Sequence, residues 1–196
     1  MRRLLLIACV LFAPVVHATV LVPAEFREVV QGSELIAYGR VVDTRPQWAD
    51  GRTRIDTVVT VEVASWLKGG SDDTITFKVP GGEMGRYRSV LIGAPVFKPG
   101  DEAVLFLKSD GSEFPIVFGL NQGVFRVRID PDTGRRMVVP PPLMATSSAP
   151  EVVTRGAATR RPLALDEFGA QVRAAMAPLP GAPGRAAAAE RRGAGR

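Results

Sequence analysis

The fold is decided by residues 38–70, YGRVVDTRPQWADGRTRIDTVVTVEVASWLKGG, a stretch that predicts two long strands joined by a turn. The first strand is expected over residues 38–44 and the second over residues 54–66. Between them, Asp50-Gly51 supplies the positive φ that a tight reversal needs. Three valines of the second strand alternate with polar residues and predict one buried face: Val59, Val61 and Val63. A hairpin this rich in β-branched residues needs more strands to cover its apolar face.

The rest of the folded part supplies those strands. A short helix is expected over residues 22–31, with Pro23 at its first position. Further strand patterns are separated by Gly and Pro turns, at 74–79, 83–95 (irregular), 103–107, 115–119, 123–130 and 135–139. Residues 103–107 are apolar throughout, which is typical of a strand covered on both faces. We therefore predict a mainly β fold, an antiparallel OB-like barrel or small sandwich, with a short N-terminal helix and one C-terminal helix.

A set of core positions follows from the same alternation. The side chains expected inside the domain are Ile36, Val41, Val59, Val61, Val63, Ile75, Phe77, Leu105, Phe125 and Val127.

The chain divides into five segments by composition. They are a signal peptide (1–18), a β-barrel domain (19–140), a linker (141–162), an amphipathic helix (163–177) and a disordered Ala/Arg/Gly/Pro tail (178–196). The helix is indicated by four large apolar residues at helical spacing: Leu165, Phe168, Val172 and Met176. We expect it to return to the barrel, over one open end, because an exposed Phe168 would be a liability. Docking on a partner is the alternative.

The N-terminus carries the features of an export signal. Arg2 and Arg3 precede an apolar run over residues 4–12, and small residues favour cleavage after Ala18. The run is shorter than the roughly 20 residues that a spanning helix needs, so a membrane anchor is less favoured. Lipidation at Cys9 is also less favoured, because almost no apolar run precedes it. We expect a secreted or periplasmic protein with no transmembrane span in the mature chain.

Cleavage would remove the only cysteine, Cys9, and the only histidine, His17. A mature chain without thiol or imidazole cannot form disulfides, thiolate or histidine metal sites, cysteine nucleophiles or Ser-His-Asp triads. We therefore expect no metal, no cofactor and no catalytic residues.

The positive charge of the chain belongs to its C-terminal part. Residues 19–140 have 15 Lys and Arg against 16 Asp and Glu, whereas residues 141–196 have 8 Arg against 4 acids. A nucleic-acid-binding domain usually carries its basic patch on the fold. Nucleic acid is therefore not an expected partner.

Several motifs have a functional and a plain interpretation. The glycine-rich residues 80–85 could cradle a phosphate, but a strand rather than a helix is expected after them, which favours a turn. Asp72-Asp73 and Asp130-Pro131-Asp132 lack the further oxygen ligands of a calcium loop. Carboxylate pairs for glycoside hydrolysis can be drawn from four residues whose separation the sequence does not give: Glu62, Glu83, Asp101 and Glu102.

The most distinctive local composition is a binding candidate. Met84, Arg86, Tyr87 and Arg88 stand between glycines and are followed by the loop Gly93-Ala94-Pro95. These residue types are favoured in binding hot spots. The alternative is a twisted edge strand with solvated arginines.

Three stretches together resemble the netrin-like module, an OB-type barrel also found in tissue inhibitors of metalloproteinases. They are ELIAYGRVV (34–42), VEVASWLKG (61–69) and KPGDEAVLFL (98–107). The resemblance implies a barrel and a binding role. It does not carry over zinc chelation, because the inhibitors use an N-terminal cysteine and this chain would begin at Thr19.

These observations favour a non-enzymatic, exported protein-binding module, such as a modulator of another exported protein, for example a protease. One alternative is a structural protein held at the cell envelope by its basic tail. A less favoured alternative is a carboxylate-dependent hydrolase. The sequence gives no oligomeric state.

Overall fold

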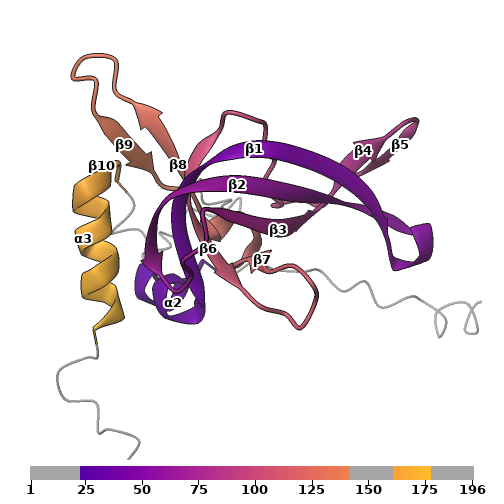
Figure 1. The fold of residues 1–196 in the computed structure, drawn as a ribbon, viewed down its shortest axis with the longest axis horizontal. Coiled ribbons are helices and arrows are strands. Elements are labelled where there is room, and N and C mark those ends of the chain that lie inside the picture. Colours follow the sequence, from indigo (N-terminus) through magenta and orange to yellow (C-terminus); the bar gives the residue numbers. More distant parts are fainter. Residues whose placement is uncertain (1–22, 142–160, 178–196) are drawn as a thin grey trace, which may run out of the picture.

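The computed structural model describes residues 23–141 and 161–177. The expected signal peptide (1–18), the tail (178–196) and most of the linker lie outside the described residues. Strands hold 47% of the described residues. The helices and strands, in chain order, are α2 (Phe26–Gly32), β1 (Leu35–Ala49), β2 (Arg54–Lys68), β3 (Thr74–Pro80), β4 (Gly82–Met84), β5 (Tyr87–Ser89), β6 (Glu102–Lys108), β7 (Ile116–Val117), β8 (Val124–Ile129), β9 (Arg136–Val139), β10 (Leu163–Ala164) and α3 (Leu165–Met176) (Figure 1). Two 3₁₀ turns cover Asp50–Arg52 and Leu120–Gly123.

Five strands close into a barrel, as the sequence predicts. The circuit runs β1-β2-β3-β7-β6 and returns to β1, because β1 pairs with both β2 and β6. One pairing is parallel, between β3 and β7, so the barrel is mixed rather than purely antiparallel. Strands β8, β9 and β10 extend the sheet beyond β6.

The long hairpin β1–β2 is the frame of the molecule, and both strands reach beyond their predicted ends. Gly51 has φ 64 in the turn, as the Asp-Gly pair predicts. The register of β1 against β2 shifts at three places between Ile36 and Asp43. Such irregularities bend a strand, and here they let residues 35–40 pair with β6 on the opposite edge.

Strand β6 separates two hydrophobic cores, which confirms that it is covered on both faces. Leu105 points into the barrel, whose interior is lined by Val41, Val59, Val61, Ile75, Phe77, Val79, Phe97, Ala103, Leu107, Val117 and Val124. Phe106 points outward to a second core, which contains Phe26, Val29, Val30, Ile36, Val104, Phe125, Val127, Val138, Phe168, Val172 and Ala175. Of the predicted core residues only Val63 is half-buried; the others are buried.

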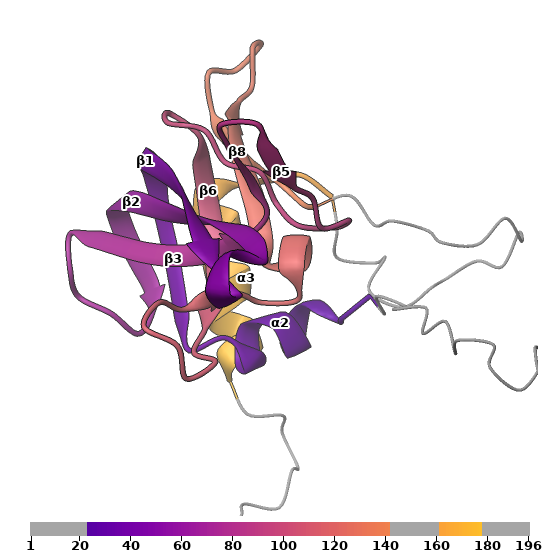
Figure 2. The same cartoon turned by 90° about the vertical axis from the view of Figure 1, so that its right-hand side faces the viewer.

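Helix α3 docks on the domain, as predicted, but not at the expected place. Phe168 and Val172 pack with α2 against the outer faces of β6 and β8. The prediction that α3 covers an open end of the barrel is therefore wrong. Figure 2 shows α2 at the bottom of the view and α3 behind the barrel strands. Neither helix within residues 23–141 and 161–177 has the length and apolar character needed to cross a membrane.

The N-terminal helix begins later than predicted. It starts at Phe26, and the Glu28 carboxylate accepts a hydrogen bond from the Glu25 backbone N–H at 2.9 Å. This capping interaction satisfies a donor that the first helical turn leaves free. Pro23 therefore lies before the helix and not at its first position.

Candidate functional site

The β4–β5 hairpin brings together the four binding residues predicted from the sequence. Met84 faces Tyr87 across the hairpin, and Gly85 (φ 59) lies in the turn between them. Arg86 donates a hydrogen bond to the Tyr87 hydroxyl at 2.8 Å, and its guanidinium lies 5.0 Å from the ring centre. Arg88 forms an exposed ion pair with Glu83 at 3.1 Å. Pairing ends at Ser89, so the single irregular strand expected over residues 83–95 is wrong.

The hairpin is fixed to the far end of β1–β2. The Thr57 hydroxyl donates a hydrogen bond to the Gly81 carbonyl at 2.7 Å, and Trp48 packs edge-on against Tyr87 with ring centres 5.3 Å apart. Gly82 has φ 151, and a Cβ there would lie 2.7 Å from the Thr57 hydroxyl. Only glycine fits that position without displacing Thr57. The candidate residues are thus held on a rigid frame.

The loop after the hairpin exposes apolar side chains, three of which lie in the strand expected over residues 83–95. The most exposed are Val90 (70%), Ile92 (80%) and Val96 (74%), and Leu91 is exposed as well. The loop is nevertheless anchored, because the Gly93 carbonyl accepts a hydrogen bond from the Asn121 N–H at 3.2 Å. Phe97 is buried, with its ring 5.3 Å from that of Phe77.

The hairpin and the loop border a hollow of about 320 Å³. Hairpin and loop residues line it together with Thr57 and Val79 of the barrel. A neighbouring hollow of about 200 Å³ shares Val79, Pro80 and Pro95 with it and is bordered by charged residues. We call the surface formed by residues 82–97 the hairpin–loop surface.

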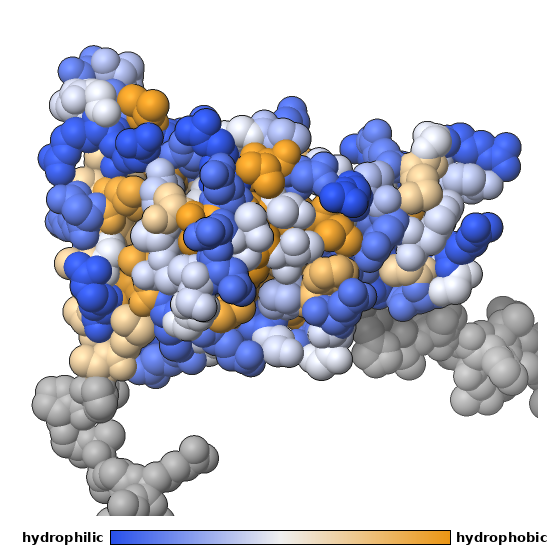
Figure 3. Space-filling model, in the orientation of Figure 1, coloured by the Kyte–Doolittle hydropathy of each residue, from blue (hydrophilic) through white to orange (hydrophobic). Residues whose placement is uncertain are grey.

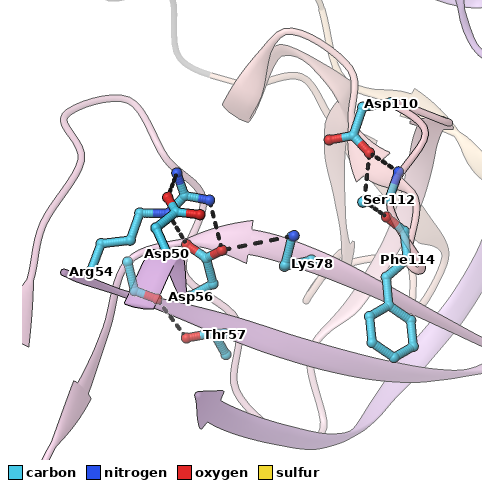
Figure 4. A network of polar contacts seen from close by, with 9 residues as sticks. Asp50, Arg54, Asp56, Thr57, Lys78, Asp110, Ser112 and Phe114 are labelled. Atoms are coloured by element: carbon cyan, nitrogen blue, oxygen red, sulfur yellow. Dashed lines mark hydrogen bonds and ion pairs between the residues drawn. The ribbon is translucent and has the colours of Figure 1, made fainter. Parts of the chain in front are cut away.

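Asp56 is the centre of the charged residues at the second hollow (Figure 4). It is 1% exposed and accepts hydrogen bonds from Arg54 Nε at 3.0 Å and from its terminal nitrogen at 3.1 Å. Lys78 Nζ lies 3.9 Å from the same carboxylate, and Asp50 pairs with Arg54 at 2.8 Å. A buried carboxylate is tolerated when it is paired and hydrogen-bonded in this way. Side-chain periodicity does not indicate this network, because its members lie on two strands and a turn.

Of the four carboxylates considered for hydrolysis, only Glu62 and Glu102 line one hollow, of about 280 Å³, among the described residues. Glu83 pairs with Arg88 on the hairpin, and Asp101 pairs with Arg126 at 2.7 Å. Glu62 is exposed and has no ion pair with any described residue.

Glu102 lies in a polar cluster at the hollow that it shares with Glu62. It accepts hydrogen bonds from the Tyr38 hydroxyl at 2.8 Å, from Arg40 at 2.6 Å and from Arg136 at 3.4 Å. Burial raises the pKa of Glu102, but the three donors outweigh burial and hold that pKa below its ordinary value. Burial and the bond to Glu102 raise the pKa of Tyr38. This carboxylate therefore stays ionised at neutral pH.

The loops considered for phosphate and calcium have structural roles. Residues 80–82 lead into β4 and not into a helix. Asp130 accepts hydrogen bonds from the backbone N–H groups of Thr133 and Asp132, at 3.1 and 2.9 Å, which lower its pKa. Within the part of the chain that the structure describes, no group of three or more His, Cys, Asp or Glu residues could hold a metal.

Comparison with family models, with curated proteins and with solved structures found no match to this chain.

Proposed function

We propose that this chain is an exported, non-enzymatic protein-binding module whose partner docks on the hairpin–loop surface. The observation that carries the proposal is the exposure of Val90, Leu91, Ile92 and Val96 within seven residues of chain; Tyr87, three residues earlier, is exposed as well. Contiguous apolar surface on a soluble domain marks interaction sites, since each such residue costs free energy while it faces water.

The surroundings of the apolar residues support the same conclusion. Tyr87 and Arg86 are residue types enriched in hot spots, and Met84 lies opposite Tyr87. The hollow of about 320 Å³ offers a recess for an anchoring side chain. Because the surface is held by Phe97 and by the Thr57 bond to Gly81, little ordering would be needed on binding.

Export is supported by the composition of residues 1–18, and it implies that the partner is also an exported protein. The resemblance to netrin-like modules favours modulation of a protein such as a protease. It concerns the strands at 34–42, 61–69 and 98–107 and not the hairpin–loop surface, so the partner's identity must come from experiment.

Substitution at the most exposed residue tests the proposal. Ile92→Glu should leave the free energy of unfolding within about 0.5 kcal/mol of the wild type, because the side chain is exposed. It should weaken partner binding about tenfold or more, since a charge would have to be buried in the contact. Partners are captured on the immobilised chain from periplasm or culture medium, identified by mass spectrometry and then titrated in purified form.

The matched control is Ile129→Glu, which places the same charge at another exposed isoleucine, 66% exposed, at the end of β8. A partner that is lost with Ile92→Glu and kept with Ile129→Glu supports the proposal. If both variants keep the partner equally, the hairpin–loop surface is not where it docks.

A further inference from the structure

A second concave surface lies at the other end of the β1–β2 hairpin. A groove of about 630 Å³ is lined by Tyr38 of β1, Leu67 of β2, Arg135 and Arg136 of the β8–β9 turn and strand β9, and residues of α3. In Figure 1, α3 and the β4–β5 hairpin lie at opposite ends of the molecule. The groove is therefore separate from the hairpin–loop surface. We call it the α3 groove.

The α3 groove is positively charged around an apolar floor. Arg135, Arg136 and Arg173 line it, with Asp166 as the single acid among its lining residues. The Arg135–Asp166 pair is 3.6 Å long, and both side chains are mostly exposed, so it holds Arg135 only weakly. Arg173 forms no ion pair or hydrogen bond with any residue that the structure describes. Figure 3 shows hydrophobic residues between strongly hydrophilic ones over α3.

Arg136 still has hydrogen-bond donors that could bind a ligand. Arg136 uses its Nε toward Glu102, at 3.4 Å, which leaves its two terminal nitrogens. Glu102 is already satisfied by Tyr38 and Arg40. An arginine guanidinium can bind a carboxylate through two parallel hydrogen bonds. The three arginines are therefore suited to binding carboxylate groups.

Gly169 contributes to the shape of the groove. It is a buried glycine inside α3 and lines the groove. A Cβ there would lie 3.5 Å from the Arg173 guanidinium and 3.7 Å from Leu67, which is ordinary contact distance. Alanine would therefore fit and would favour the helix by roughly 0.5–1 kcal/mol. The packing does not require glycine, and a methyl group there would lie beside Arg173 and Leu67, two residues that line the groove.

We propose that the α3 groove binds an extended peptide through a carboxylate, with the arginines holding the acid and an aliphatic side chain lying on Leu67 beside Gly169. Charge complementarity favours this ligand, because three arginines line the groove and meet two acids, Asp166 in the lining and Glu102 beside Arg136.

The test uses the full chain and fluorescent hexapeptides that alternate leucine with glutamate or with glutamine. The amidated glutamate peptide should bind and the amidated glutamine peptide should not. Binding of the glutamine peptide with a free C-terminus would show that a terminal carboxylate also serves. Arg173→Gln should weaken binding of the glutamate peptide about tenfold, as expected for loss of a hydrogen bond between charged groups. The matched control Arg128→Gln, an exposed arginine of β8 outside the groove, should leave it unchanged.

Gly169→Ala separates binding from folding. The variant should melt at a higher temperature than the wild type and bind the glutamate peptide several-fold more weakly, because its methyl group occupies the groove. The proposal is overturned if the two amidated peptides bind alike, if neither binds, or if Arg128→Gln weakens binding as much as Arg173→Gln. It is also overturned if Gly169→Ala binds like the wild type.

Discussion

Replacing Phe168 by alanine tests how α3 is held on the domain. Phe168 is 3% exposed, and its ring centre lies 5.5 Å from that of Phe26, 6.3 Å from Phe106 and 5.0 Å from Phe125. These contacts join α3 to α2, β6 and β8. Phe168 is therefore the largest of the three α3 side chains in the second core, beside Val172 and Ala175.

The expected magnitude follows from that burial. Truncating a buried phenylalanine to alanine costs about 3–5 kcal/mol, which includes the lost ring contacts and the cavity left behind. An isolated helix of 12 residues is marginal in water, so α3 has little stability of its own to offset the loss. Phe168→Ala should therefore lower the free energy of unfolding by about 3–5 kcal/mol and speed hydrogen exchange along α3.

Urea unfolding followed by tryptophan fluorescence measures the first effect, and hydrogen exchange with mass spectrometry measures the second. The control is Ile129→Ala, which truncates an exposed side chain and should stay within about 0.5 kcal/mol of the wild type. A loss below about 1 kcal/mol for Phe168→Ala, with α3 amides as protected as in the wild type, would refute the packing described for this helix.

Two further predictions concern the barrel. Leu105→Ala empties a buried position inside it and should lower the free energy of unfolding by about 2–5 kcal/mol, measured by urea unfolding; a loss under about half a kcal/mol would remove Leu105 from the core. Folding lowers the pKa of Glu102 from its ordinary value of 4.5. The ionised Glu102 therefore contributes fully to the free energy of unfolding above the pKa of the unfolded state, and this contribution is lost as pH falls through the pKa of the folded state. Thermal melting of the wild type and of Glu102→Gln from pH 7 to pH 3 should show a smaller acid-induced loss in the variant, and equal losses would contradict the assigned interactions with Tyr38, Arg40 and Arg136.

The sequence by itself determined the local elements. The alternating valines of 54–66, the Asp50-Gly51 reversal and the apolar run 103–107 correspond to the β1–β2 hairpin and to β6. The bounds of α3 match its apolar spacing, and the grouping of Met84, Arg86, Tyr87 and Arg88 matches the β4–β5 hairpin. These features were predictable because side-chain periodicity and turn chemistry are properties of neighbouring residues.

Tertiary structure alone decided which strands meet and which apolar residues remain exposed. The bends in β1 that let it pair with β6, and the parallel pairing of β3 with β7, depend on closing a barrel from distant segments. Residues 90–92 have the composition of a strand, yet Gly93 and Pro95 interrupt pairing there and the chain turns instead.

Contacts at the α3 groove and in the Asp56 network also depend on tertiary structure. Gly169 meets Leu67 only because α3 packs on the outside of the barrel, and Asp56 meets Lys78 only through the register of β2 with β3. Periodicity encodes which face of an element is apolar, but not which distant element covers that face. That choice is made by the packing of the whole chain, since the free energy of burial depends on area and not on sequence distance.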